Sequence, residues 1–234
     1  GDRRLKLAFL GTGSAFSPER YNGAIVVEGR VMLDAGAPLL PHMHRLGIQP
    51  IDIDVVFLTH FHGDHTLGLP PFVLHRIFVD KPRAITFVGP DGIDKRLEAL
   101  FELSWGVDWK PVMLPRFKAR YVTARKRGRV AGHEYETVRL DHGSTGCNGY
   151  RIKFGDRVLA YSGDTEPTAP LDALVDGADV AIVEATGPGD VFSHMSWEAA
   201  AALKKRHPKT RFVFNHLFSG TVTGAAKDLQ VLEV

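Results

Sequence analysis

The sequence predicts an α/β protein, an αββα sandwich of two mixed β-sheets flanked by helices. Two observations favour this fold class. Short apolar runs alternate with segments of helical spacing after a strand-rich start, and histidine or aspartate residues follow several of those runs. The chain has 234 residues, 44% of them hydrophobic, which suffices for one substantial core. We therefore expect a single domain over residues 1–234.

The first part of the chain supplies most of one sheet. Apolar runs of strand length occupy residues 5–11, 24–29, 30–36 and 54–60, with a short helix predicted at 38–47. A longer helix is expected over residues 64–78. We place its start at Asp64, because an acidic side chain suits a helix N-terminus.

The alternation continues to the end of the chain. Residues 91–105 are predicted to be helical because Ile93, Leu97, Leu100 and Phe101 recur at helical spacing. Residues 120–130 and 133–140 are expected to form a strand pair, and 150–155 and 157–163 a hairpin with a Gly-Asp turn. The remaining predicted strands are 84–89, 179–185 and 211–216, and the remaining helices are 168–177 and 196–207.

The segment THFHGDH, residues 59–65, directly follows a predicted strand and concentrates metal-binding residue types. Gly63 permits a tight turn, which can aim the side chains of His60, His62, Asp64 and His65 at one point. Imidazole and carboxylate groups are preferred ligands of zinc and, less selectively, of iron or manganese. The segment therefore predicts part of a metal site.

Three further candidate ligands follow other predicted strands. His142 comes after strand 133–140, Asp164 after strand 157–163, and His216 at the end of strand 211–216. Strand ends are where a sheet delivers functional groups to its rim. The ordered set HxHxDH, then His, Asp and His, is a strong signal of a metal centre.

These motifs resemble the metallo-β-lactamase fold superfamily, most closely its branch of ribonuclease Z and related phosphodiesterases. The resemblance covers nearly the whole chain, through LAFLGTGSA, LDAG, LTHFHGDHTLGLP, DHGSTGCNGYRI, YSGDT, VEAT, SHMS and FNHL. It implies a dinuclear site in which one metal is held by His60, His62 and His142, the second by Asp64, His65 and His216, with Asp164 bridging them.

Such a site would supply its own nucleophile. Two dications about 3.5–4 Å apart can share a hydroxide, because water on a catalytic zinc ionises with a pKa of about 7. Asp64 is also placed to accept a proton from that water, with its basicity reduced by metal ligation. We expect two divalent ions as cofactors, with zinc favoured over manganese or iron.

The same resemblance implies a general acid that protonates the leaving group. Glu184 matches the glutamate of the HEAT motif of ribonuclease Z, and His194 matches the histidine of its HST motif. A carboxylate beside an imidazole favours the imidazolium, so His194 could protonate a departing alkoxide while Glu184 orients it. In the alternative, His194 only precedes a helix capped by Ser196. The chain departs from these motifs at Val183 and Met195.

The favoured function is a dinuclear hydrolase of phosphodiesters with a metal-bridging hydroxide as nucleophile. Lactones, thioesters or sulfate esters are the alternative substrates of the same site. A transfer-RNA 3′-processing endonuclease, a diiron oxidoreductase and a metal-binding protein without turnover rank lower. The tRNA activity is ranked lower because residues 89–142 show no counterpart of the flexible arm with which ribonuclease Z grips tRNA.

Four other residues carry open alternatives. The resemblance implies that the loop GTGSAF lies beside the active site, where Thr12, Ser14 or backbone N–H groups could line the substrate pocket. Nucleotide binding is not expected there because Phe16 replaces the third glycine of a dinucleotide loop. Asp34 is either a residue that orients a ligand histidine or a turn aspartate at a strand end. Cys147 is expected to be a small buried residue.

Charge and composition limit the classes of partner that we expect. The net charge is +2, yet residues 118–129 carry six lysines and arginines, either as a solvated hairpin or as a phosphate-contacting arm. A small-molecule or nucleotide-like ester is the expected partner, nucleic acid is less favoured, and a homodimer is left open. A single cysteine and the lack of a signal-like or long apolar segment favour the cytoplasm and no membrane.

Overall fold

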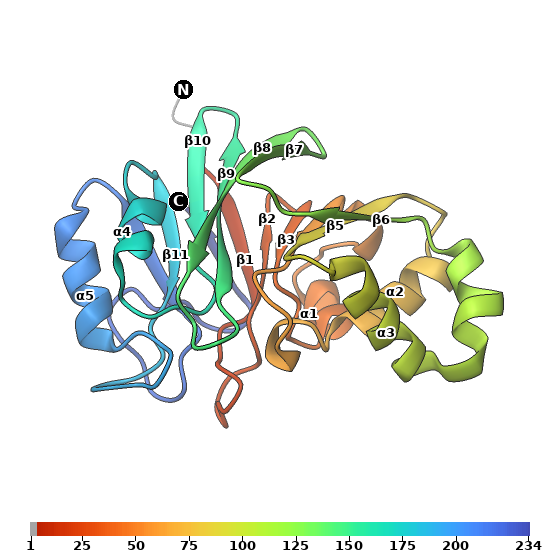
Figure 1. Ribbon diagram of the computed structural model, residues 1–234, viewed down its shortest axis with the longest axis horizontal. Helices are drawn as coiled ribbons and strands as arrows, with labels where there is room; N and C mark the ends of the chain where they lie inside the picture. The colour runs from red at the N-terminus through yellow and green to blue at the C-terminus, as the bar shows by residue number, and fades with distance from the viewer. Residues whose placement is uncertain (1–3) are drawn as a thin grey trace.

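Two mixed β-sheets form the centre of the computed structural model, which describes residues 4–234 (Figure 1). The seven-stranded sheet has the order β13-β1-β2-β3-β4-β5-β6 and the six-stranded sheet the order β12-β11-β10-β9-β8-β7. The strands of the first sheet are β1 (Lys6–Gly11), β2 (Ala24–Val27), β3 (Val31–Leu33), β4 (Val55–Phe57), β5 (Ile85–Gly89), β6 (Ala119–Thr123) and β13 (Gln230–Glu233). Those of the second are β7 (Arg127–Val130), β8 (His133–Leu140), β9 (Cys147–Phe154), β10 (Arg157–Tyr161), β11 (Val180–Glu184) and β12 (Arg211–Asn215).

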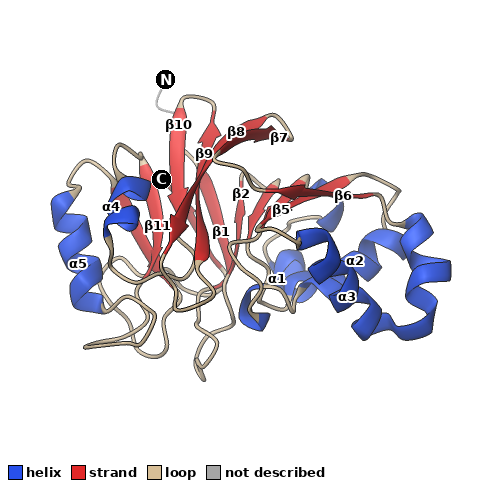
Figure 2. Ribbon diagram, in the orientation of Figure 1, coloured by secondary structure: helices blue, strands red, loops and turns tan. Residues whose placement is uncertain are grey.

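Helices cover the outer faces of both sheets (Figure 2). On the seven-stranded sheet lie α1 (Leu39–Arg45), α2 (Leu69–Phe78) and α3 (Ile93–Trp105), and on the six-stranded sheet α4 (Ala169–Val175) and α5 (Trp197–Arg206). A separate apolar layer, including Phe9, Phe57 and Tyr150, fills the space between the sheets. The predicted αββα sandwich is confirmed. No helix among residues 4–234 has both the length and the apolarity of a membrane span.

The helix predicted to start at Asp64 starts later. Gly63–His65 form one turn of 3-10 helix, and α2 begins only at Leu69. Two prolines at 70 and 71 explain the boundary, because residues without an N–H donor are tolerated in the first helical turn and disrupt a helix interior. The intervening turn leaves the side chains of Asp64 and His65 free of the helix.

The predicted strand pair 120–130 with 133–140 is only half correct. Arg127–Val130 does pair antiparallel with β8, but Ala119–Thr123 pairs parallel with β5 in the other sheet. Stacking of Tyr121 on Phe87, with ring centroids 5.7 Å apart, holds β6 there. The sequence pattern also missed β13, which pairs antiparallel with β1, and the short helical turns of residues 106–116.

Candidate metal centre

All seven predicted metal ligands lie together at one end of the two sheets. His60, His62, Asp64 and His65 belong to the segment that follows β4 in the first sheet. In the second sheet, His142 follows β8, Asp164 follows β10 and His216 follows β12. Strands whose ends meet at one rim thus bring together side chains that are up to 156 positions apart.

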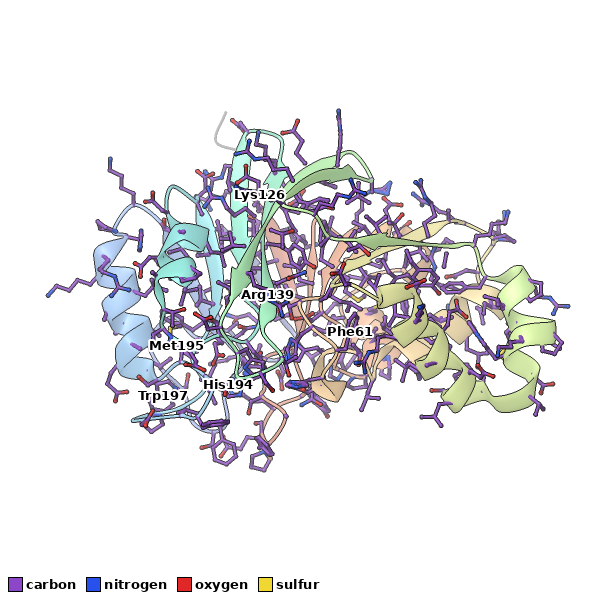
Figure 3. All side chains as sticks on the ribbon, viewed as in Figure 1. Phe61, Lys126, Arg139, His194, Met195 and Trp197 are labelled. Carbon is purple, nitrogen blue, oxygen red and sulfur yellow. The ribbon has the colours of Figure 1, made fainter. Side chains whose placement is uncertain are left out.

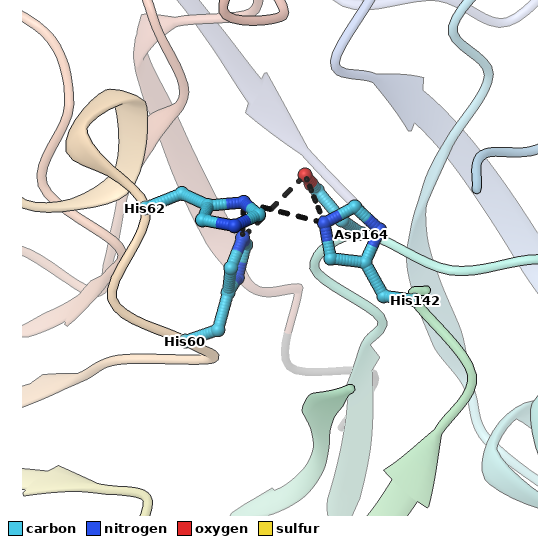
Figure 4. A group of neighbouring side chains, drawn as sticks. All are labelled: His60, His62, His142 and Asp164. Carbon is cyan, nitrogen blue, oxygen red and sulfur yellow. Dashed lines mark hydrogen bonds and ion pairs between the residues drawn. The ribbon is translucent and has the colours of Figure 1, made fainter. Parts of the chain in front are cut away.

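The first group comprises His60, His62, His142 and Asp164 (Figure 4). His62 Nδ1 lies 2.9 Å from His60 Nε2 and 3.3 Å from His142 Nε2. The Oδ2 atom of Asp164 lies 3.7 Å from both His60 Nε2 and His142 Nε2. Three imidazole nitrogens and one carboxylate oxygen therefore face a common point.

The second group comprises Asp64, His65, His216 and again Asp164. Here the other oxygen of Asp164, Oδ1, lies 3.2 Å from His65 Nε2 and 3.2 Å from His216 Nε2. Asp64 Oδ2 lies 3.2 Å and 3.3 Å from the same two nitrogens. Asp164 thus presents one oxygen to each group, which is the geometry a bridging ligand requires.

Buried polar atoms in this site lack partners and therefore fit a cation. His65 Nε2 and Asp164 Oδ1 are buried and make no hydrogen bond among the described residues. The Nδ1–H of His65 donates to Asp34 Oδ2 at 2.8 Å, so a neutral ring turns the lone pair of Nε2 toward two carboxylates. Such a contact needs either a proton or a metal ion between the atoms. The ligand atoms within each group all lie within 4.8 Å of one another.

Protonation in the metal-free site follows burial and charge. Burial, helped by the charge of His65, lowers the pKa of His60 to about 2, so its ring is neutral, as a metal ligand must be. Burial also disfavours the charge of His65, but Asp164 and Asp34 outweigh it and raise the pKa of His65 well above its usual value. The buried carboxylates therefore favour a positive charge in the site even when no metal ion is bound.

Asp34 holds the metal-binding turn in place. Its buried carboxylate accepts hydrogen bonds from the backbone N–H and the hydroxyl of Thr59 at 2.8 and 2.9 Å, and from the Tyr161 hydroxyl at 2.8 Å. Together with the bond from His65, these contacts orient the His65 ring. Of the two alternatives for Asp34, the structure has the orienting contact.

Glu184 and His194 form a hydrogen-bonded pair beside the two groups. His194 Nδ1 donates to Glu184 Oε1 at 2.9 Å and lies 4.0 Å from Asp164 Oδ2. Burial lowers the pKa of His194, but the hydrogen bond and charge of Glu184 outweigh it and raise that pKa above its usual value. Ser196 caps α5 by accepting from Ala199 N, as expected, so His194 precedes a helix and also contacts the site.

Glu184 is itself fixed by the backbone. Its buried carboxylate accepts from Thr165 N at 2.7 Å, Met195 N at 3.1 Å and the Thr186 hydroxyl at 2.6 Å. The Met195 position that departs from the family motif thus contributes a backbone donor. Figure 3 shows His194 and Met195 side by side on the loop before α5.

Several supporting contacts had no signal in the sequence. His142 Nδ1 donates to the carbonyl oxygen of Ser193 at 2.8 Å, and the Thr186 hydroxyl lies 3.2 Å from His216 Nδ1. These bonds fix the tautomer that leaves each Nε2 free to bind metal. A backbone carbonyl carries no sequence signature. Thr59 near the end of β4 and Thr186 near the motif residue Glu184 could have been predicted as supporting residues.

Thr12 does not line the active-site cavity as expected. Its buried hydroxyl donates to Asp228 Oδ1 at 2.8 Å and ties the loop after β1 to the C-terminal segment. Ser14 does line the cavity. Cys147 is fully buried, as predicted, with Sγ 3.8 Å from His60 Nδ1 and outside the groups that could hold a metal.

Two cavities are lined by predicted metal ligands. The larger, about 1220 Å³, contains Asp64, His142, Asp164, His194 and His216. A second, about 560 Å³, is lined by His60, Phe61, Arg96 and Arg139 among others. The lysines and arginines of residues 118–129 are exposed, and Arg127 forms an ion pair with Glu136 at 2.9 Å.

Comparison with known proteins agrees with this architecture. A family model described as a beta-lactamase superfamily domain matches residues 29–217. A ribonuclease Z of Methanothermobacter thermautotrophicus is 24% identical over 297 aligned positions, covering 98% of this chain and 97% of that protein. A ribonuclease Z of Bacillus licheniformis is 27% identical over 270 positions, covering 91% and 88%.

Solved structures share the fold. The metallo-beta-lactamase fold protein YhfI from Bacillus subtilis has a TM-score of 0.80 with 15% identity, covering 99% of this chain and 100% of that one. A diphosphatase from the PhnP family has a TM-score of 0.74 with 19% identity, covering 99% and 97%. The short form of human tRNase Z has a TM-score of 0.75 with 23% identity, covering 97% and 98%.

Proposed function

The chain belongs to the β-lactamase superfamily and is a hydrolase, and on that premise we propose that it is a dinuclear metal-dependent phosphodiesterase. One observation carries the proposal. Asp164 directs one carboxylate oxygen toward each of two groups of three further ligand residues. A single shared carboxylate between two complete ligand sets suits a pair of ions better than one ion.

The proposed ligands divide as the geometry groups them, with His60, His62 and His142 on one ion, Asp64, His65 and His216 on the other, and Asp164 shared. Two divalent ions held there, for which we propose zinc, would supply ionised water near neutral pH and would offset the negative charge of a phosphodiester. Asp64 contributes a carboxylate that can accept a proton from the attacking water. Burial raises the pKa of Asp64, but its contacts with His216 and His65 outweigh this and lower that pKa, so the carboxylate is ionised and only weakly basic.

His194 is the proposed leaving-group acid. Glu184 holds its Nδ1–H, which leaves Nε2 as the atom that would carry the transferable proton. Burial of Glu184 and its three further hydrogen bonds prevent the pair from rotating as a unit. A departing alkoxide is a strong base and gains most from this proton, whereas an activated aryl oxide gains little.

The curated relatives reverse the order in which the sequence patterns ranked RNA and small phosphodiesters as substrates. Residue patterns alone placed small phosphodiesters ahead of RNA, but the curated relatives described above are ribonuclease Z enzymes that align with nearly the whole chain. We therefore propose RNA cleavage of the ribonuclease Z type as the first candidate activity. Nucleic acid becomes the first candidate partner.

Small nucleotide esters remain the second candidate because of a specific difference in length. The alignment with the Methanothermobacter enzyme spans 297 positions, 63 more than the 234 residues of this chain. Between β5 and His142 the chain forms only α3, the short turns of 106–116 and the strands β6 to β8. No separate arm extends from this part of the described chain, so long RNA would have to be gripped in another way.

A substrate panel on metal-loaded protein tests the proposal. We expect about two ions per chain and hydrolysis of a precursor tRNA, a cyclic nucleotide or bis(p-nitrophenyl) phosphate ahead of lactones, thioesters and aryl sulfates. The phosphodiester that is cleaved most rapidly decides whether RNA or a small ester is the preferred substrate. A protein that binds two ions yet cleaves only lactones, thioesters or sulfates would replace the phosphodiesterase proposal, and a protein that retains no metal would overturn it.

We also propose one domain over residues 1–234, supported by ligand groups that draw on both sheets and would be divided by any boundary between them. The cytoplasm as location and a homodimer stay proposals made from the sequence.

A further inference from the structure

Large apolar side chains surround the mouth of the 1220 Å³ cavity. Phe192 is 91% exposed, Phe16 79%, Leu67 61% and Phe218 45%, and all four line this cavity. They come from four loops: the one after β1, the metal-binding turn, the loop before α5 and the segment after β12. Exposed apolar side chains that gather around one opening mark a binding surface, because isolated ones would remain scattered.

The same cavity contains a buried hydroxyl without a partner. Ser14 is 2% exposed, lines the cavity, and its Oγ makes no hydrogen bond among the described residues. Asn22, which also lines the cavity, donates its Nδ2–H to the Ser14 carbonyl at 3.0 Å and so braces this wall. A buried unpaired hydroxyl is costly, so it favours a ligand with a hydrogen-bonding edge.

The charge of the cavity lining restricts the ligand further. Among the described residues that line this cavity there is no lysine or arginine, whereas the smaller cavity lined by His60 contains Arg96 and Arg139. No lysine or arginine of the described lining would therefore pair with an anionic substrate group beside the phenylalanines. An aromatic wall favours a flat ring, and the Ser14 hydroxyl favours a polar edge on that ring.

We propose that this cavity binds an unpaired nucleobase of the substrate, stacked on Phe192 or Phe16 with its edge at Ser14. Placement of that base next to the scissile phosphodiester rests on the proposed function, since the proposed ligands form the floor of the cavity. The base-binding residues determine specificity and leave the chemistry to the metal centre. Phe192 is two residues from His194, so base binding also orders the loop that carries the proposed acid.

Equilibrium titration separates the base site from catalysis. Adenosine 5′-monophosphate and ribose 5-phosphate share a phosphate and a sugar, and we expect the first to bind metal-loaded protein about tenfold more tightly. Phe192→Ala should remove most of that difference, and Ser14→Ala part of it, with unchanged thermal unfolding. Phe78→Ala is the matched control, because Phe78 is 54% exposed and lies outside the cavity.

Equal affinity for the two ligands, or equal effects of Phe192→Ala and Phe78→Ala, would overturn the base site. A loss of dimer in Phe192→Ala with unchanged nucleotide affinity would instead assign the aromatic surface to contact between copies of the chain. Hydrolysis adds a second readout. We expect thymidine 5′-p-nitrophenyl phosphate to exceed methyl p-nitrophenyl phosphate in kcat/KM. Failure to cleave either ester counts against the proposed function, while the titration still decides the base site.

Discussion

His62 is the one proposed ligand among the seven whose side chain is exposed. Its substitution should therefore separate metal binding from folding. We expect His62→Ala to abolish turnover and to lower the metal content by about one ion per chain. In the metal-free state, stability should change by less than about 0.5 kcal/mol, because exposed side chains contribute little to the core. Elemental analysis and thermal unfolding measure both quantities.

The matched control is His44→Ala, which removes another exposed histidine, from α1, that lines neither cavity and belongs to no ligand group. It should leave both metal content and turnover unchanged. A His62→Ala protein that keeps two ions and full activity would show that His62 is not a ligand.

The effect of replacing His194 on kcat should depend on the leaving group of the substrate. Without its proton, an alkoxide leaving group should be expelled roughly 10²–10⁴-fold more slowly, whereas a p-nitrophenolate needs no proton and should lose less than about tenfold. The comparison is kcat of wild type and His194→Ala on an RNA or alkyl phosphodiester and on bis(p-nitrophenyl) phosphate. An equal loss on both substrates would leave His194 with a binding or structural role.

At the residue scale, sequence patterns locate candidate ligand residues that follow the end of a strand. His142, Asp164 and His216 could be predicted because each comes directly after an apolar run. The carbonyl oxygen of Ser193 that orients His142 could not, because any residue type offers a carbonyl. Phe192 was also missed, since a single exposed aromatic acquires meaning only from loops that are distant in the sequence.

The metal-binding turn depends on close contact with the end of β3. A Cβ added at Gly36 would overlap the carbonyl oxygen of Asp64 and lie 2.8 Å from the Asn22 Cβ. Because backbone cannot yield as a flexible side chain does, Gly36→Ala should displace the turn. We expect weaker metal binding, reduced turnover and a loss of about 1–3 kcal/mol in stability, measured by metal titration, kinetics and denaturant unfolding.

Gly23→Ala is the control for that substitution, because a Cβ at Gly23 meets no atom within 4 Å. Both variants lower the conformational entropy of the unfolded chain, so only the clash distinguishes them. If the two variants bind metal equally well, the turn tolerates displacement.

Element boundaries were the least predictable part of the fold. The helix start at Leu69 instead of Asp64 follows from prolines whose effect competes with the acidic N-terminal signal. The sheet to which Ala119–Thr123 belongs depends on a partner strand some thirty residues away, and the periodicity of a strand does not name its partner. The central strands were foreseen from short apolar runs, and the five α-helices from helical spacing, although β3 and β4 have only three residues each.

The smaller cavity offers a test of how RNA would be held. Arg96 lies over the Phe61 ring at 5.8 Å, and Arg139 donates to the Thr145 carbonyl at 2.6 Å, so both guanidinium groups line the cavity next to His60. Arg96→Ala should raise KM for RNA several-fold and lower the salt slope of RNA binding by about 0.7, the value for one phosphate contact on a single strand. Hydrolysis of bis(p-nitrophenyl) phosphate should be unaffected.

Arg127→Ala controls for a general loss of positive charge, because Arg127 is exposed, paired with Glu136 and outside that cavity. It should leave the RNA salt slope unchanged. An equal effect of Arg127→Ala would assign phosphate contact to residues 118–129, and no effect of either variant would leave the smaller cavity without a role in RNA binding.

The whole molecule is organised so that bound ions would join its two sheets. His60, His62, Asp64 and His65 extend from the seven-stranded sheet, whereas His142, Asp164 and His216 extend from the six-stranded one. The apolar layer between the sheets already holds them together, so the ions act on the rim. This division explains why the two proposed ligand groups could be predicted only as a set, because each of them draws residues from both halves of the chain.

Metal removal should consequently lower the stability of the entire chain. Each ion that binds only the native state stabilises it by about 2.7 kcal/mol at one hundred times its dissociation constant, so two ions contribute about 5.4 kcal/mol. For a chain of this size, 1 kcal/mol corresponds to roughly 2–4 °C in Tm, so chelation should lower Tm by about 10–20 °C. Calorimetry before and after chelation, followed by zinc addition, measures the effect, and His62→Ala should show a smaller shift than wild type. A Tm that stays constant while the metal content falls from two ions to none would mean that the ions do not join the sheets.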